Sequence, residues 1–325
     1  MPDTTELIGW LPYQLKNVNN EYICRWLHCG DKEFIEPFFD ETIGKCKQFS
    51  CNSSRFLPVS NLSILPEWGL TLNTIQPTAF IFHISRCGST LVSQMLGLND
   101  SHIVLSEVPF FDQILKMIDS NELAFNPDPA LLLKTAIQFY GQNRNGRKNQ
   151  LFIKMDSWHI YFMPLLRKLY PKTPFVLLYR KPDEVIRSQQ QKRGIHAVPG
   201  LIADHILGIN HAINAAFDLD MHMALVLESY FKSFIDISQQ DKNILLVNYN
   251  QGIELIMAEI YNFTGLKISD EESKAIKERK RFDAKAPDQK FIKDLSGNSV
   301  PDYQKNVFKL YECLDKQRHA LSLLK

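Results

Sequence analysis

The sequence has no excess charge of either sign, no long apolar run and no evident leader. Its 325 residues include 37 Lys and Arg against 36 Asp and Glu, which leaves a net charge of +1. This balance argues against a general nucleic-acid-binding protein, although it allows a local basic cleft. No run reaches the roughly 18 apolar residues that a membrane span needs. Residues 1–17 lack a basic segment followed by an apolar one, so we expect no signal peptide and predict a cytoplasmic protein.

Cysteine is also scarce, with six residues in the chain. So few cysteines in a chain of this length do not indicate a disulfide framework. Cys24, Cys29, Cys46 and Cys51 form two pairs with four residues between the members of each, and a four-thiolate zinc site is one interpretation of them. Reduced thiols are the other interpretation, because zinc knuckles usually have shorter spacing and turn glycines. We expect reduced thiols and no bound metal.

The pattern of apolar and polar residues changes near residue 76. Residues 1–75 are rich in aromatic residues and are interrupted by Pro and Gly, so we expect a small N-terminal extension or subdomain there. From residue 76 to 325, short apolar runs alternate with helical patterns, although the C-terminal tail is weakly patterned. Strands are predicted at 79–84, 102–108, 150–155, 175–180 and 243–250. This alternation predicts an α/β domain, a parallel central sheet with helices on both faces.

The strongest candidate for an anion site lies in FIFHISRCGSTLVSQML, residues 80–96. Its loop Arg86-Cys87-Gly88-Ser89-Thr90 lies between a predicted strand and a helix, where backbone N–H groups and the positive end of the helix converge. Gly88 lets the backbone approach an anion, the two hydroxyls add donors, and Arg86 adds a forked cation. The Gly-Lys-Ser/Thr ending of triphosphate-binding loops is missing. Taken alone, the loop is equally compatible with an ordinary strand-to-helix turn.

Three segments together resemble the sulfotransferase family. HISRCGSTL at 83–91 is similar to the first motif of that family in its bacterial form. FVLLYRKPDEVIRS at 175–188 is similar to the second motif, in which a Ser follows an Arg by eight residues. ILLVNYNQ at 244–251, followed by IYNFTGL at 260–266, resembles a third feature. The resemblance covers about residues 78–270 in the correct order.

Two departures from the family pattern stand beside this resemblance. The triplet Asn248-Tyr249-Asn250 lacks the acidic residue that often lies beside this Tyr in the family. The Arg-Lys-Gly motif that animal members carry near the C-terminus is not evident, and ERKRF at 278–282 is an alternative for it.

The resemblance implies a modified P-loop fold and the donor 3′-phosphoadenosine 5′-phosphosulfate (PAPS), with no metal. This donor needs two anion sites. The loop residues would hold its phosphosulfate, and Arg180 and Ser188 would bracket its 3′-phosphate. Both motifs are expected at the carboxyl edge of the sheet. The donor-binding residues predicted in this way are Arg86, Cys87, Gly88, Ser89, Thr90, Arg180 and Ser188. A simple ion pair of Arg180 with Asp183 or Glu184 is the alternative.

An acceptor hydroxyl must lose a proton, so a general base is expected. Glu107, in LSEVPFFD, is the first candidate because it follows a strand at the same edge, and the resemblance supports a Glu there. A cap of the next helix or a pair with Arg86 is its alternative role. His196, in QKRGIHAVPG, is the second candidate. Lys154 and Asp156 are expected at the same edge, and Trp158 is expected in the core or beside a ligand.

The function predicted from the sequence is therefore transfer of a sulfuryl group from PAPS to a hydroxyl or amine of a small molecule or peptide. Arg86 is expected to stabilise the charge that develops on the leaving oxygen. A small-molecule kinase and a non-catalytic nucleotide-binding protein are the alternatives. The acceptor is not specified by any motif, but residues 1–75 and 190–230 are expected to shape its pocket.

Overall fold

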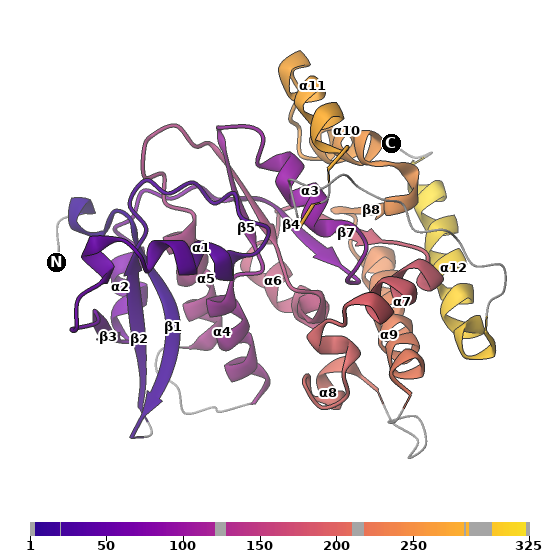
Figure 1. The fold of residues 1–325 in the computed structure, drawn as a ribbon, viewed down its shortest axis with the longest axis horizontal. Helices are drawn as coiled ribbons and strands as arrows, with labels where there is room; N and C mark the ends of the chain where they lie inside the picture. The colour runs from indigo at the N-terminus through magenta and orange to yellow at the C-terminus, as the bar shows by residue number, and fades with distance from the viewer. Residues whose placement is uncertain are drawn as a thin grey trace. The chain divides into compact units, whose positions relative to one another are not determined.

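The structure is a computed structural model that describes residues 4–19, 21–120, 128–209, 218–282, 284–285 and 301–322 (Figure 1). Its strands are β1 Trp10–Val18, β2 Glu21–His28, β3 Val59–Asn61, β4 Pro77–His83, β5 His102–Ser106, β6 Gln150–Lys154, β7 Phe175–Tyr179 and β8 Ile244–Asn248. Its helices are α1 Phe39–Cys46, α2 Ile64–Gly69, α3 Ser89–Leu96, α4 Pro109–Asp119, α5 Pro129–Tyr140, α6 Met163–Leu169, α7 Pro182–Gln191, α8 Asp204–Leu207, α9 Leu219–Gln240, α10 Ile253–Phe263, α11 Asp270–Arg279 and α12 Lys305–Ser322.

The chain forms two compact units. Unit 1 comprises Met1–Phe80, Ser93–Met155 and Leu165–Thr173, and unit 2 comprises Ile81–Val92, Asp156–Pro164 and Pro174–Lys325. The first 80 residues thus share a unit with part of the α/β region. The boundary predicted between residues 75 and 76 stays a prediction.

The central sheet confirms the predicted α/β class. Its five parallel strands lie in the order β5-β6-β4-β7-β8, and helices flank it. The strands begin and end within two residues of the predicted positions. All residues of β5 and β7 are buried. Continuous burial explains why these segments are apolar throughout and do not alternate, as expected of a parallel sheet covered by helices.

Unit 1 contains an antiparallel sheet that the sequence did not reveal, in the order β1-β2-β3. Helices α4 and α5 pack on each other and on β1. The Tyr140 hydroxyl, at the end of α5, donates to the carbonyl of Pro12 at 2.7 Å. β1 has three consecutive buried residues, Leu11, Pro12 and Tyr13, because α4 and α5 cover it. Its burial therefore departs from the two-residue period by which a half-exposed strand is recognised.

In unit 2, α9 and α12 lie side by side and α7 contacts both (Figure 1). Within the weakly patterned tail, residues 305–322 form the long helix α12. Its Asp315 accepts hydrogen bonds from Tyr179 (2.7 Å) and Asn248 (2.9 Å), the last residues of β7 and β8. Although burial opposes ionisation, the bonds from Asn248, Tyr179 and Arg318 prevail and lower the pKa of Asp315. An ionised carboxylate of α12 therefore fastens the carboxyl ends of both strands.

None of the helices in the described part of the chain is long and apolar enough to cross a membrane.

Candidate active site

The loop that follows β4 has an unusual backbone. We call residues 85–90 the anion loop. Ser85 and Arg86 have φ values of 67° and 47°, and Gly88 has a φ of 82°. Left-handed conformations cost a non-glycine residue about 1–3 kcal/mol each and persist only where the surroundings impose them. Left-handed residues in turns are components of nests, in which successive backbone N–H groups form a concavity that suits an anion.

Contacts within unit 2 hold this backbone in place. The Ser85 N–H donates to Nδ1 of His83 at 3.1 Å, and the Ser85 hydroxyl accepts from the Gln189 side chain at 3.1 Å. Cys87 is fully buried, and its thiol lies 3.4 Å from the Leu178 carbonyl. Its side chain is therefore a packing group, which leaves Cys87 only its backbone N–H for an anion. Ser89 and Thr90 begin α3 and are about 95% buried, with 5% and 6% exposure.

Gly88 lies against the ring of Tyr249. A Cβ atom at position 88 would overlap ring atoms of Tyr249, and the positive φ disfavours any other residue as well. The guanidinium of Arg180 lies over the same ring, 5.0 Å from its centroid. One Arg180 N–H also donates to the Arg86 carbonyl at 3.3 Å. The segments predicted as three separate motifs thus meet around Tyr249.

Arg180 also makes the ion pair foreseen as its alternative role. Its Nε lies 2.5 Å from Oε2 of Glu184, and Asn250 donates to Oε1 of Glu184 at 3.0 Å. Asp183 pairs instead with Arg187 at 2.7 Å. The Arg180 side chain retains 15% exposure. A phosphate at Arg180 would therefore share the guanidinium with Glu184. Ser188, half-buried on α7, lies one turn beyond Glu184.

The Arg86 side chain is half-buried. One terminal nitrogen donates to the carbonyl of Lys192, just after α7. Its Nε is buried and has no hydrogen-bond partner among the described residues. Burial lowers the pKa of the Arg86 guanidinium, although not enough to neutralise a group of this basicity. Arg86 therefore retains an unused donor and its positive charge beside the loop.

Glu107 lies in unit 1, immediately after β5, with a φ of 56°. Its Oε1 is 2.9 Å from Nζ of Lys154, whose side chain is completely buried, and its N–H donates to the Lys154 carbonyl at 2.9 Å. The N-cap position of α4 is occupied by Val108, whose side chain makes no capping hydrogen bond. The Glu107 side chain is 20% exposed, which leaves the carboxylate accessible to a ligand.

His196 is buried, with 5% exposure. Its Nδ1 lies 3.2 Å from the Ser157 hydroxyl and its Nε2 lies 3.0 Å from the Gln189 side-chain nitrogen. Both ring nitrogens are engaged, which makes His196 a poorer candidate than Glu107 for proton abstraction. The role of either residue as base stays a prediction.

The other residues expected near this edge have structural contacts. Asp156 caps the 3₁₀ turn Ser157–Phe162, and its Oδ1 accepts from the Ser157 N–H at 2.5 Å. Trp158 is fully buried and packs edge-on against His159, as the core interpretation predicts. In the segment 190–230, residues 210–217 lie outside the described residues. ERKRF at 278–282 spans the end of α11, where the Arg279 guanidinium donates to the Phe282 carbonyl at 3.2 Å.

The early cysteines do not form a cluster that could bind zinc. Within the part of the chain that the structure describes, no group of three or more His, Cys, Asp or Glu side chains is arranged to hold a metal ion. Cys24, Cys29 and Cys46 are buried, whereas Cys51 is exposed. Burial raises the pKa of Cys46 to about 11, which favours the neutral thiol over the thiolate that a metal requires.

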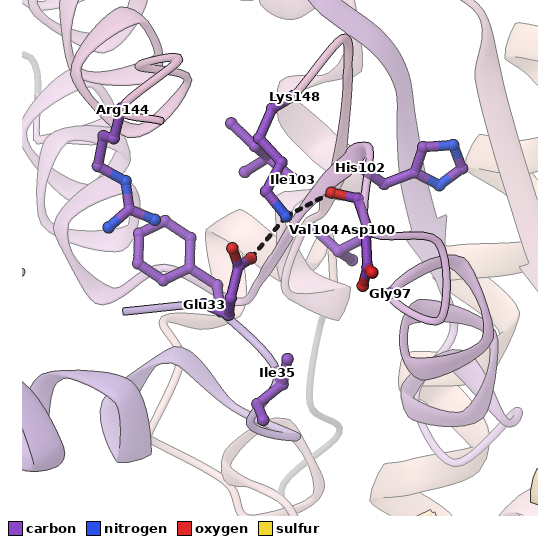
Figure 2. A pocket seen from close by; sticks show the side chains of 10 residues that line it. Glu33, Ile35, Gly97, Asp100, His102, Ile103, Val104, Arg144 and Lys148 are labelled. Atoms are coloured by element: carbon purple, nitrogen blue, oxygen red, sulfur yellow. Dashed lines mark hydrogen bonds and ion pairs between the residues drawn. The ribbon is translucent and has the colours of Figure 1, made fainter. Parts of the chain in front are cut away.

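Unit 1 also contains a small pocket at the amino end of β5 (Figure 2). Lys148 crosses it and donates to Glu33 at 2.6 Å and to the Asp100 carbonyl at 2.8 Å. Its volume of about 50 Å³ is far below the roughly 300 Å³ of a typical ligand site. The pocket therefore does not fit a nucleotide or an acceptor.

Two contributors to the site were missed in the sequence. Gln189 carries no motif signal, since it lies in a polar run, QQQ, at the end of α7. The partnership of Lys154 with Glu107 was missed because the two belong to different strands. Their equivalent positions at the ends of β5 and β6 were a usable signal, since the register pairs Ser106 with Lys154.

Comparison with known proteins identifies the domain that carries this site. A family model described as a sulfotransferase domain matches residues 76–309. A search of curated proteins finds no match.

Several solved structures are similar at low identity. The sulfotransferase STF1 from Mycobacterium tuberculosis H37Rv is 12% identical, with 80% of this chain and 81% of that chain covered and a TM-score of 0.44. The sulfotransferase domain of the Synechococcus PCC 7002 olefin synthase is 15% identical, with 74% and 95% covered and a TM-score of 0.46. A sulfotransferase from Alicyclobacillus acidocaldarius is 12% identical, with 76% and 95% covered and a TM-score of 0.42.

Proposed function

The chain belongs to the sulfotransferase family, and from this premise we propose that it moves a sulfuryl group from PAPS to a hydroxyl or amine of a small molecule or peptide. The observation that carries the proposal is the meeting of the anion loop and Arg180 around Tyr249. Two cationic side chains and a strained loop within one unit suit a ligand with two separate anionic groups.

The anion loop is the proposed site of the phosphosulfate. The donors proposed for the oxygens of that group are the loop N–H groups after Ser85, the start of α3 and the unused Nε of Arg86. Arg180 and Ser188 are the proposed site of the 3′-phosphate. That phosphate would compete with Glu184 for Arg180, so binding exchanges one anionic partner for another. An exchange of this kind favours a doubly charged phosphate over a single carboxylate.

The proposed reaction is a displacement at sulfur. The acceptor oxygen or nitrogen forms a bond to sulfur while the bond between sulfur and the bridging phosphate oxygen breaks. 3′-Phosphoadenosine 5′-phosphate (PAP) then leaves with the electron pair. Arg86 and the loop N–H groups stabilise the charge on the departing oxygen. Glu107 takes the acceptor proton, and Lys154 keeps the carboxylate in a fixed position. These residues need no metal for either task.

Ligand-induced stabilisation tests this proposal before any acceptor is known. PAP at about 100 times its dissociation constant should stabilise the folded protein by roughly 2.7 kcal/mol. For a protein of this size, that stabilisation raises the melting temperature by a few degrees. We expect the shift to be unchanged by EDTA, and we expect ATP with magnesium to give little shift. A larger shift with ATP and magnesium, abolished by EDTA, would replace the sulfotransferase proposal with a kinase.

The proposed role of Arg180 predicts a selective loss of affinity. Arg180→Ala should weaken PAP binding by about ten- to a hundredfold, since a charge-assisted hydrogen bond is worth about 1.5–3 kcal/mol. Binding of AMP should change much less, because AMP lacks the 3′-phosphate. Calorimetric titration with both nucleotides measures the difference.

Arg187→Ala is the matched control for Arg180, since Arg187 makes a comparable ion pair with Asp183, the other acidic residue in the first turn of α7. This variant should leave both affinities near their wild-type values. Equal losses of PAP and AMP binding in Arg180→Ala would assign Arg180 another task.

A further inference from the structure

We propose that Gln189 is a positioning residue that holds the anion loop in its donor-binding conformation, by donating one amide hydrogen to Ser85 and the other to His196. The inference rests on the proposed function, since it concerns the same loop. It assigns a task to two buried polar residues, Gln189 and His196, that do not touch the reacting atoms in the proposed mechanism.

The orientation of the Gln189 amide is fixed by a backbone donor. The Gly194 N–H donates to Oε1 of Gln189 at 2.8 Å. A backbone N–H cannot accept, so the atom facing it is the amide oxygen. The other end of the amide, the NH₂ group, therefore faces Ser85 at 3.1 Å and His196 at 3.0 Å. Gln189 is fully buried, so all of these bonds are made away from water.

This orientation also determines the tautomer of His196. The NH₂ group of Gln189 is a donor, so Nε2 of His196 must accept and carries no hydrogen. The hydrogen of the neutral ring then lies on Nδ1, which donates to the Ser157 hydroxyl at 3.2 Å. Ser157 can in turn donate to Asp156, whose Oδ1 is 3.2 Å away. Each member of the chain has one consistent hydrogen-bonding role.

The network ends at the strained part of the anion loop. Ser85 has a φ of 67°, a conformation that its own backbone disfavours, and its hydroxyl receives the Gln189 hydrogen bond. The adjacent Arg86 is tied to the Lys192 carbonyl, which follows the same helix. The end of α7 and the turn Ile195–Ala197 therefore brace the loop from one side. Without this brace, we expect the loop to populate conformations in which its N–H groups no longer converge.

The expected effect is a loss of ligand affinity. If only about a tenth of the molecules keep the binding conformation, the apparent affinity falls about tenfold. We expect Gln189→Ala to weaken PAP binding to that extent. Gln190→Ala is the matched control, because it removes the neighbouring glutamine, whose side chain is exposed and bonds Asp220. That control should bind PAP with wild-type affinity.

A double-mutant cycle separates this role from general damage to the fold. Ser85→Ala removes the hydroxyl that accepts the Gln189 bond, so Ser85→Ala and Gln189→Ala together should lose little more PAP affinity than Gln189→Ala alone. Losses that multiply would show that Gln189 does not act through Ser85. Arg86→Ala serves as the reference for the proposed function. If Arg86→Ala binds PAP normally, the loop is not the donor site. If Arg86→Ala weakens binding but Gln189→Ala stays within twofold of wild type, the positioning role alone is wrong.

Histidine nitrogen NMR gives a second readout that does not depend on ligand. In the ¹⁵N-labelled protein, with His196 assigned by comparison with His196→Gln, we expect hydrogen on Nδ1 and none on Nε2. Gln189→Glu keeps the shape and the bond to Gly194 but presents an acceptor to the ring, so hydrogen should move to Nε2. It should also weaken PAP binding, as Gln189→Ala does. Hydrogen on Nε2 in the wild-type protein, or an unchanged spectrum in Gln189→Glu, would overturn the proposal.

Discussion

Glu107→Gln is expected to lower the rate of sulfuryl transfer by about 10²–10⁴, the usual contribution of a general base. The change preserves the shape of the side chain and removes its capacity to take a proton. PAP affinity should remain near the wild-type value, because Glu107 has no proposed contact with the donor. The rate can be measured by incubating a metabolite extract with donor labelled in its sulfuryl group and following its transfer by mass spectrometry.

Glu33→Gln is the matched control for this experiment. Glu33 also pairs with a buried lysine, Lys148, at 2.6 Å in the same unit, but it lies at the opposite end of β5. Both changes leave a buried ammonium without its anionic partner, so both should lower the melting temperature. Only Glu107→Gln should slow transfer. If Glu107→Gln turned over at the wild-type rate, the role of base would pass to His196 or to a water molecule.

Gly88→Ala is expected to abolish most donor binding. Its positive φ of 82° costs another residue about 1–2 kcal/mol, and the overlap of a Cβ with Tyr249 adds a packing cost of about 1–3 kcal/mol. If the anion loop shifts to relieve the backbone strain and the overlap with Tyr249, its N–H groups no longer point to a common anion. A total of about 2–5 kcal/mol corresponds to a loss of PAP affinity between roughly thirtyfold and several thousandfold. Calorimetry with PAP measures this loss, and circular dichroism verifies that the protein is folded.

Gly200→Ala is the control for backbone strain at a positive φ without a steric overlap. Gly200 has the same φ of 82°, but nothing lies within 4 Å of a Cβ built there. This variant should bind PAP within a few-fold of wild type. The double variant Gly88→Ala/Tyr249→Ala should lose less PAP affinity than the losses of the two single variants added together. The reason is that Tyr249→Ala removes the ring that a Cβ at position 88 would overlap. Additive losses would show that contact with Tyr249 is not what requires a glycine.

The central sheet could be predicted from the sequence because its signal is local. The strands β4, β5, β6, β7 and β8 are short apolar runs bounded by polar residues. The hairpin of β1 and β2 gave no such signal, because α4 and α5 cover part of β1 and alter its alternation. The helix α12 was missed for a related reason. It buries only a few side chains, Val307, Tyr311 and Leu314 among them, so its apolar face is narrow.

The residues of the site also divide into those that the sequence could identify and those whose contacts only the structure shows. Arg86, Gly88 and Arg180 could be named from the sequence because each immediately follows or nearly follows a strand, and parallel strands bring such positions to one edge. The sequence also offered Glu184 as an alternative partner of Arg180, because the two are four residues apart. It could not show that Lys154 pairs with Glu107, or that His196 is buried with both nitrogens engaged. These are contacts between elements that lie far apart in the chain or are turned toward each other by packing.

The sequence by itself determined the class of the fold, the order of the strands along the chain and the loop that suits an anion, since these depend on residue type and on short-range backbone preference. Only the tertiary structure decided what the side chains near that loop can do. The brace from Gln189 to Ser85, the contact of Gly88 with Tyr249 and the attachment of Asp315 to β7 and β8 join residues between about 65 and 160 positions apart. No local pattern encodes such pairs, because their geometry arises only when helices and strands have packed into the compact unit that contains them.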